Sequence, residues 1–360
     1  MQEKGKISSF QLYCLMFNFL IGSTIIMQSL TAAGRDTWIS EILAVLAGAV
    51  MVLVYKRLAC IFPNMTLIQY SQVIFGKYVG KLIAIIYLWF FLHLGVLVLR
   101  NFGEFLTNLV MPETPIWFFH VTLVLVCAWF ICCGLEIMGR TSELIFPVNM
   151  LLIFLTIILV ALSQVMDMKN FLPFLEHGTA NILKGAFARA SFPYLETVLF
   201  TMLFPFVNTV KNSKKAALWA VFSAGAVLLA LLLQDISVFG ENLATFSFPR
   251  YAVIRLISVG NFLDRIDPVV IAVWITTALV KVGVCLYAFV LGLAQILGMK
   301  DYKPLTKPAA ALMAVLSILV YENTYEMLDF AINIWPVYAF PFEVGLPLLM
   351  LVLVSWRRLF

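Results

Sequence analysis

The stretch that decides the fold is Ala190-Ser-Phe-Pro-Tyr-Leu-Glu-Thr-Val-Leu-Phe-Thr-Met-Leu-Phe-Pro205, an apolar run that carries a single acid, Glu196. Glu196 follows Pro193 by three residues, and a proline removes a backbone hydrogen bond from a helix. A carboxylate inside a membrane is costly unless it faces protein or a water-filled cavity. A helix break and an acid at the same depth therefore indicate a ligand pathway through a helical membrane protein.

The composition supports a membrane location. Hydrophobic residues make up 63% of the 360 residues, charged residues make up 12%, and the mean hydropathy is +1.00. This leaves too little polar surface to cover a water-soluble globule of that size. The expected surroundings are a lipid bilayer. The net charge of +5 is explained by membrane topology, so no nucleic-acid partner is expected.

Apolar segments long enough to cross a bilayer as helices, at about 20 residues each, follow one another along the whole chain. We expect ten transmembrane helices, at 10–30, 38–58, 82–105, 116–135, 142–164, 190–207, 216–238, 268–297, 305–321 and 335–356. These runs are longer and more continuously apolar than the strands of a transmembrane barrel. The predicted fold class is an all-α integral membrane protein with a single polytopic domain, 1–360.

The distribution of Lys and Arg predicts the orientation. If the N-terminus is cytoplasmic, fifteen of the 24 Lys and Arg fall on the cytoplasmic side, seven fall on the outer side, and Arg100 and Lys281 lie within spans. Cytoplasmic loops of membrane proteins are enriched in Lys and Arg. We therefore expect both termini in the cytoplasm.

The ten spans divide into two halves of five, 1–164 and 190–360, joined by an outer loop at 165–189. Because five is odd, the second half enters the membrane in the opposite direction, and an inverted repeat follows if the halves share a fold. In transporters of that kind, discontinuous helices at equivalent positions of the two halves mark a site near the midplane. Here the equivalent positions are Gly22-Ser23-Thr24, in helix 1, and Pro193 to Glu196, in helix 6.

Several ionisable residues lie inside the predicted spans. Lys281 and Glu196 fall near the middle, where they either form an intramembrane pair or include a neutral partner, and the sequence does not choose between these. His93 is a further candidate for proton or charge coupling, with a hydrogen-bonded packing role as the alternative. Arg100 and Glu104 are four residues apart and share a helix face near a membrane boundary, which predicts a salt bridge.

Signs of enzyme chemistry are missing from the sequence. No span combines a nucleophile with a base, no glycine-rich phosphate loop is present, and the six cysteines lack metal-ligand spacing. We therefore expect no catalytic residue, no metal and no cofactor, and the protein is not expected to be an enzyme.

Short motifs give the chain a resemblance to a known family. They are Ile7-Ser-Ser-Phe-Gln-Leu12 leading to Gly22-Ser23-Thr24, Ser191-Phe-Pro-Tyr-Leu-Glu196, and Leu203-Phe-Pro-Phe-Val-Asn208. Together with ten spans in this length, they resemble the permease-like B subunits of bacterial spore germinant receptors. That family belongs to the amino acid-polyamine-organocation superfamily and is similar in fold to the LeuT-like transporters with five-plus-five inverted repeats.

The resemblance implies a role, a site and partners. Such subunits bind a small nutrient germinant, an amino acid or a sugar, and signal to a membrane-bound A subunit and a lipoprotein C subunit in the inner spore membrane. Germinant is expected to close the two discontinuous helices around itself. The implied pocket residues are Gly22, Ser23, Thr24, Leu94, Leu97, Val98, Tyr194, Leu195, Glu196, Gly283, Val284 and Tyr287. Lys281 is less certain, because it can face a coupling site instead.

A proton-coupled amino-acid permease of the same superfamily is the main alternative. In that case Glu196, Lys281 or His93 carries the proton. A sensor can bind its ligand without moving it across the membrane, whereas a permease must transport it.

Overall fold

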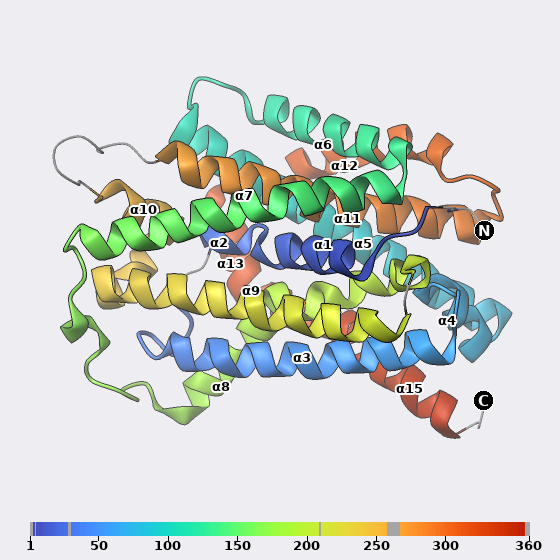
Figure 1. Ribbon diagram of the computed structural model, residues 1–360, viewed down its shortest axis with the longest axis horizontal. Coiled ribbons are helices and arrows are strands. Elements are labelled where there is room, and N and C mark those ends of the chain that lie inside the picture. Colours follow the sequence, from blue (N-terminus) through green and yellow to red (C-terminus); the bar gives the residue numbers. More distant parts are fainter. Residues whose placement is uncertain (1–2, 4, 28–29, 209, 258–266, 357–360) are drawn as a thin grey trace.

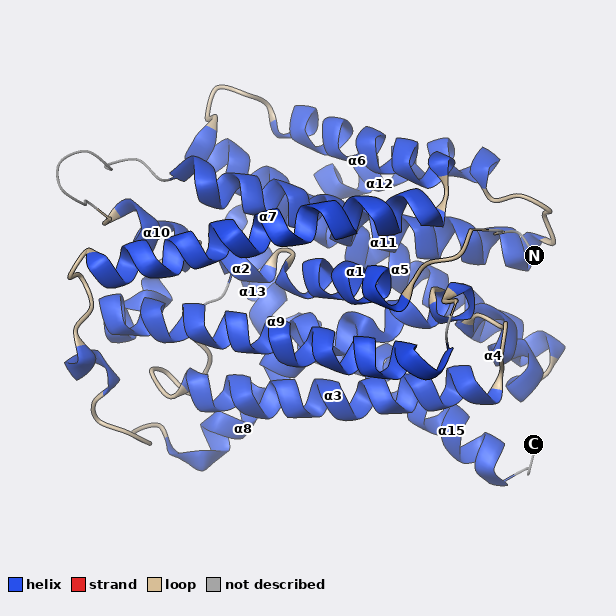
Figure 2. Cartoon of the chain, in the orientation of Figure 1, coloured by secondary structure: helices blue, strands red, loops and turns tan. Residues whose placement is uncertain are grey.

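The computed structural model describes residues 3, 5–27, 30–208, 210–257 and 267–356, without the side chains of residues 210–212. Its long helices run roughly along one axis in a single elongated bundle (Figure 1). The described residues form helices joined by loops and turns, without a strand (Figure 2). Of the charges used to predict the orientation, the side chains of Lys4, Lys211, Arg265, Arg357 and Arg358 lie outside the described part.

The α-helices differ widely in length. They are α1 (Ser9–Ile21), α2 (Thr24–Met27), α3 (Thr37–Ile61), α4 (Leu67–Phe75), α5 (Lys77–Phe105), α6 (Ile116–Cys133), α7 (Leu135–Leu162), α8 (Gly178–Arg189), α9 (Val210–Phe239), α10 (Pro249–Arg255), α11 (Asp267–Leu297), α12 (Lys303–Leu319), α13 (Thr324–Asp329), α14 (Trp335–Phe340) and α15 (Leu346–Trp356).

Short π-helical and 3-10 segments interrupt or extend these helices. The π-helical segments are η1 (Leu106–Val110), η3 (Ala190–Tyr194), η7 (Phe330–Ile334) and η8 (Pro341–Gly345). The 3-10 segments are η2 (Met168–Phe171), η4 (Leu195–Met202), η5 (Phe204–Phe206) and η6 (Gly240–Thr245).

Eight helical stretches within the described ranges are long and apolar enough to cross a membrane. They are Ser9–Met27, Thr37–Ile61, Lys77–Val110, Ile116–Cys133, Leu135–Leu162, Ser213–Thr245, Asp267–Leu297 and Thr324–Trp356. Each overlaps one of the ten predicted spans. Predicted span 305–321 corresponds to α12, which has 17 residues. Predicted span 190–207 is a series of short π and 3-10 turns.

The start of α7 departs from the prediction. The helix begins at Leu135, whereas the predicted span begins at residue 142. Gly134 has φ +101°, a left-handed value that ends α6 and lets α7 start at once. The first two turns of α7 are partly polar, with a Glu136–Arg140 ion pair at 2.6 Å, so the apolar pattern alone does not reveal them.

The first helical stretch is interrupted between Ile21 and Thr24. Its start is fixed by a capping box. The Gln11 backbone N–H donates to the Ser8 hydroxyl oxygen, and the Ser8 backbone N–H donates to the Gln11 side-chain oxygen. α1 ends at Gly22, whose N–H donates to the Asn18 carbonyl at 2.9 Å. α2 then begins at Thr24.

The second irregular region follows α8. Phe192 has φ −133° and ψ 107°, an extended conformation inside the otherwise helical segment η3. The next residue is Pro193, and the residue before a proline is disfavoured in helical geometry. The chain then continues as 3-10 helix through Glu196.

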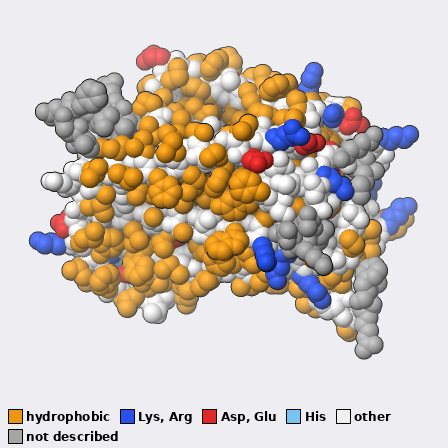
Figure 3. All heavy atoms as spheres, in the orientation of Figure 1, with side chains coloured by type: hydrophobic (Ala, Val, Ile, Leu, Met, Phe, Trp, Pro, Cys, Tyr) orange, Lys and Arg blue, Asp and Glu red, His pale blue; other side chains and the backbone are white. Residues whose placement is uncertain are grey.

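The outer surface suits a bilayer. Large apolar side chains are widely exposed, among them Trp129 at 65%, Leu144 at 73% and Trp219 at 67%. Hydrophobic atoms cover the middle of the visible face, and Lys and Arg gather toward the end of the bundle where α1 begins (Figure 3). This is the surface of a multi-pass membrane protein rather than of a water-soluble globule.

Candidate functional site

A buried ion pair lies at the centre of the molecule. Nζ of Lys281, on α11, is 2.6 Å from Oε2 of Glu196, on η4, and both side chains are 0% exposed. The sequence left open whether these residues pair, and the structure pairs them. Two charges enclosed in this way stabilise each other only while both are present.

Aromatic rings and the first interruption enclose the lysine. Its Nζ lies 4.7 Å from the ring centre of Phe192 and 5.0 Å from that of Phe19. A Cβ placed on Gly22 would lie only 2.6 Å from Cδ of Lys281 and 2.7 Å from the Phe19 carbonyl oxygen. Glycine at position 22 is therefore needed for this approach, which joins the interruption after α1 to the irregular segment around Phe192.

Beside the pair is a small cavity of about 20 Å³, which has room for about one water molecule. It is lined by Leu94, Leu97, Val98, Asn101, Phe192, Glu196, Tyr321, Phe330, Ala331 and Trp335. The α5 residues in this set share one helix face, because their spacing is three or four residues. Four of the predicted pocket residues, Leu94, Leu97, Val98 and Glu196, thus lie around one small, mostly apolar cavity.

A larger hollow lies nearer the end of the bundle opposite the start of α1. Its volume is about 430 Å³, and its polar lining comes from Thr31, Lys184, Arg189 and Asn333. Phe192 and Ala331 line both this hollow and the smaller cavity. The Phe192 ring therefore stands between the larger hollow and the buried pair.

Two hydroxyl groups at the first interruption have no hydrogen-bond partner among the described residues. They are Ser23 Oγ and Thr24 Oγ1, and both residues are buried, at 0% and 1% exposure. Buried polar atoms are normally hydrogen-bonded to protein or ordered water. These hydroxyls are therefore available to a water molecule or a ligand.

Other predicted pocket residues point elsewhere. The Tyr194 hydroxyl donates to Oε1 of Glu41, on α3, and Oε2 of Glu41 pairs with Nε of Arg189 at 2.6 Å. Tyr194 and Glu196 are two residues apart in a helical segment, so their side chains leave it on different faces. The Leu195 carbonyl oxygen lies 3.2 Å from the Tyr55 hydroxyl.

On α11, the predicted residues beyond Lys281 also face away from the cavity. Gly283 lines a separate small cavity, where Cε of Met138 lies 3.6 Å from a Cβ built at this position. Val284 is fully buried, and it lines neither this small cavity nor the cavity beside Glu196. The Tyr287 hydroxyl lies 3.4 Å from Oε2 of Glu3, in a cluster near the start of the chain.

That cluster closes the end of the bundle where α1 begins. The Tyr302 hydroxyl donates to the same Glu3 oxygen at 2.7 Å. Burial, together with the hydrogen bond to Glu3, raises the pKa of Tyr302. The Ile7 N–H donates to the Phe206 carbonyl at 3.0 Å, so the N-terminal segment also lies against the end of the irregular region.

His93 packs against aromatic side chains and contacts a tyrosine hydroxyl. Its Nδ1 lies 3.1 Å from the Tyr338 hydroxyl, and its ring stacks on Trp89 with ring centres 5.3 Å apart. It does not line the cavity beside Glu196.

Several residues around the cavity were not predicted from the sequence. Asn101 lies one helical turn beyond Leu97, so helical periodicity would have found it. Tyr321 ends the ninth predicted span, Trp335 begins the tenth, and Phe330 lies between them. Nothing in their spacing indicates the cavity. Glu343 is a fully buried acid in an apolar span, and the argument applied to Glu196 would have identified it.

The fold and the site together define a multi-pass helical membrane protein with a central cavity beside a buried ion pair. The spore germination protein family matches residues 6–325, and the chain belongs to that family. Spore germination protein KB of Bacillus subtilis (strain 168) is 30% identical over 359 residues, which cover 99% of this chain and 96% of the relative. YndE of the same organism is 25% identical over 98% of both chains, and GerQB of Bacillus cereus is 24% identical over 74% of this chain and 73% of its own.

Two solved structures share the fold of this chain. MhsT in complex with L-phenylalanine aligns with a TM-score of 0.62 and 13% identity, over 94% of this chain and 90% of its own. MHP1, a nucleobase-cation-symport-1 family transporter in a closed conformation with bromovinylhydantoin bound, aligns with a TM-score of 0.68 and 13% identity, over 94% of this chain and 77% of its own. At this identity the likeness concerns the fold.

Proposed function

We propose that the protein is the nutrient-sensing, permease-like subunit of a spore germinant receptor. It binds a small germinant, an amino acid or a sugar, in the cavity beside Glu196. The observation that supports this best is the position of the cavity, which has Glu196 in its wall and abuts the Glu196–Lys281 pair. At about 20 Å³ the cavity is closed around at most a water molecule, so a germinant enters only when the side chains around it move apart. Its mostly apolar wall with a few polar groups suits a small ligand.

The pocket residues in this proposal are those that surround the cavity and the pair. Leu94, Leu97, Val98 and Glu196 line it. Gly22 lies against Lys281, and Ser23 and Thr24 offer free hydroxyls at the adjoining interruption. Tyr194, Leu195, Gly283, Val284 and Tyr287 act from outside it, by holding the irregular segment and α11 in place.

The proposed architecture has ten crossings in a five-plus-five inverted repeat. The eight long stretches supply eight of them, and α12 and the irregular segment 190–207 supply the other two. Residues 1–164 and 190–360 are the two halves, with 165–189 as the connecting outer loop. The interruptions after Ile21 and at Phe192 make helices 1 and 6 discontinuous, which suits a binding site at half the membrane depth.

We place both termini in the cytoplasm and the protein in the inner membrane of the spore. The Lys and Arg side chains at the end where α1 begins support this orientation (Figure 3). The larger hollow then faces outward, and germinant reaches the cavity by displacing Phe192.

The proposed partners are a membrane-bound A subunit and a lipoprotein C subunit. Germinant binding closes the two discontinuous helices and shifts a two-state bundle, whose outer surface these subunits read. A ligand can shift such an equilibrium only through its different affinities for the two states, so contacts to both interrupted segments are required.

A thermal-shift screen of the purified full chain against single amino acids and sugars tests this function. A germinant at 100 times its dissociation constant stabilises the folded state by about 2.7 kcal/mol. Val98→Trp fills the cavity, so it should abolish the stabilisation. Val126→Trp, on the exposed face of α6, should keep it. The proposal fails if no amino acid or sugar stabilises the protein, or if Val98→Trp still responds.

A proton-coupled amino-acid permease is the second candidate. It is favoured by the Glu196–Lys281 pair, since a buried acid and base can exchange a proton with a ligand or with water. Uptake of a stabilising amino acid into proteoliposomes under a pH gradient separates the two functions. Binding without uptake supports the receptor, and uptake that depends on the gradient supports the permease.

A further inference from the structure

Glu343 is a second buried acid next to the proposed site. It lies in η8, within the last long apolar stretch, and its side chain is 0% exposed. The Ser191 hydroxyl donates to its Oε2 at 2.9 Å. Its Oε1 has no hydrogen-bond partner among the described residues. No Lys, Arg or His pairs with it in that part of the chain.

The charged groups that act electrostatically on Glu343 are Glu196, from η4, and Lys281, from α11. Lys281 already forms an ion pair with Glu196, at 2.6 Å. Two acids therefore share one base. If both acids were ionised, the enclosed site would carry an unbalanced negative charge, which is strongly disfavoured where water is excluded.

The tyrosine hydroxyls near Glu343 donate to backbone carbonyl oxygens rather than to its carboxyl group. The Tyr55 hydroxyl, from α3, donates to the Glu343 backbone carbonyl at 2.5 Å. The Tyr87 hydroxyl, from α5, donates to the Phe342 carbonyl at 2.9 Å. On the adjoining α14 and α15, the titratable residue is Tyr338, whose hydroxyl contacts His93. The Ser191 hydroxyl is thus the one described hydrogen-bond donor to the carboxyl group.

We propose that Glu343 is the proton-binding residue of this site and is held as a neutral carboxylic acid while Glu196 and Lys281 are paired. Oε2 is then the carbonyl oxygen that accepts from Ser191, and Oε1 carries the proton. The proton comes from water and returns to water. No covalent bond other than this O–H forms or breaks.

The hydrogen bond between Ser191 and Glu343 joins two segments of the molecule, and the first of them is proposed to move. Ser191 belongs to η3, immediately before the extended residue Phe192, and Glu343 belongs to the last helical stretch. Loss of the proton would give Lys281 a second carboxylate to attract it from Glu196. An added cationic group would also balance that charge, so proton binding at Glu343 and binding of a cation beside it oppose each other.

The test is infrared spectroscopy of the purified full chain in lipid nanodiscs at neutral pH, without any germinant. Wild type should show the carbonyl stretch of a protonated carboxylic acid, and Glu343→Gln should lose it. Ser191→Ala should move the band to higher frequency, because the hydrogen bond to the carbonyl oxygen is removed. The matched control is Glu41→Gln, which removes an equally buried acid that has its own partner, Arg189, and should leave the band unchanged.

The inference is overturned if wild type shows no such band, or if the band survives in Glu343→Gln. Should Glu343→Gln fail to fold, Ser191→Ala decides, since an unshifted band would assign the proton to another acid. Because no germinant is added, the outcome is independent of whether the proposed receptor function holds.

Discussion

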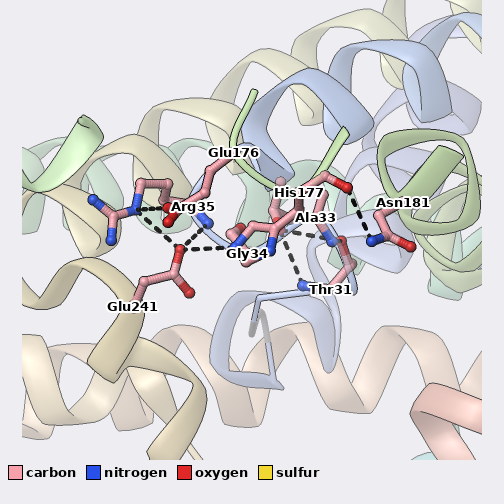
Figure 4. A network of polar contacts seen from close by, with 9 residues as sticks. Thr31, Ala33, Gly34, Arg35, Glu176, His177, Asn181 and Glu241 are labelled. Carbon is pink, nitrogen blue, oxygen red and sulfur yellow. Dashed lines mark hydrogen bonds and ion pairs between the residues drawn. The ribbon is translucent and has the colours of Figure 1, made fainter. Parts of the chain in front are cut away.

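Two acid–base clusters of this protein share their chemistry and differ in where they lie. At the centre, Lys281 and Glu196 are 2.6 Å apart and 0% exposed. At the end of the bundle opposite the start of α1, Nε of Arg35 lies 3.0 Å from Oε1 of Glu241, with side chains 18% and 38% exposed (Figure 4). The exposure of an ion pair to water, more than the identity of its residues, determines how much the pair contributes to the free energy of unfolding.

The physical reason is the solvent. At the bundle end, water solvates each charge if its partner is lost, so exposed pairs contribute about 0–1 kcal/mol. The Glu241 oxygen also accepts from the Arg35 backbone N–H at 2.8 Å and lies 3.4 Å from Nε2 of His177, so its bonds join separate loops. In the centre no water replaces a lost partner, and breaking a buried pair costs about 3–5 kcal/mol.

The largest effect is expected for Lys281→Met. It leaves Glu196 buried without its cation, and the free energy of unfolding should fall by about 3–5 kcal/mol. Denaturant unfolding of the purified protein in detergent measures this loss. Adding Glu196→Gln to Lys281→Met removes the uncompensated charge and should restore part of the stability. If Lys281→Met alone is as stable as wild type, breaking the buried pair does not carry the large free-energy cost expected for it.

A smaller effect is expected for Gly22→Ala. The new Cβ would lie 2.6 Å from Cδ of Lys281 and 2.7 Å from a backbone oxygen, so the pair must shift. Overpacking of this kind costs about 1–3 kcal/mol. Gly283→Ala is the matched control, because its nearest neighbour is 3.6 Å away and alanine is favoured over glycine in a helix. Equal losses of unfolding free energy in the two variants would contradict a special close approach at Gly22.

The smallest effect is expected for Arg35→Gln at the bundle end. Its pair with Glu241 is partly exposed, so the loss of stability should be at most about 1 kcal/mol and should shrink in high salt. Melting temperatures of wild type and variant at low and high salt measure it. Arg140→Gln, which breaks the more exposed Glu136–Arg140 pair, is the control and should change still less. A salt-insensitive loss as large as that of Lys281→Met would remove the distinction between the two regions.

Much of the fold could be predicted from the sequence. Runs of apolar residues gave eight of the helical stretches, because a segment that faces lipid or core on all sides must be apolar throughout. The salt bridge predicted from the spacing of Arg100 and Glu104 is present, at 2.8 Å. Contacts within one helix depend only on local geometry, which residue spacing encodes.

The site was less predictable, because it depends on which faces of different helices meet. Leu94, Leu97 and Val98 share the face of α5 that lines the cavity beside Glu196, whereas the Tyr194 and Tyr287 hydroxyls contact Glu41 and Glu3. In the irregular segment around Phe192 the direction of each side chain follows from backbone angles that no periodic pattern specifies.

By itself, the sequence determined that this is an all-helical membrane protein of the spore germination family with an acid inside a broken apolar segment. These properties follow from composition, span length and short motifs, all of which are local. Only the tertiary structure decided that Lys281 pairs with Glu196 and that Gly22 makes room for this pair. It also decided that Glu343 has Ser191, and no cation of the described residues, as its side-chain partner. Such facts depend on the packing of segments distant in sequence, and in a water-free interior that packing determines which charges are balanced.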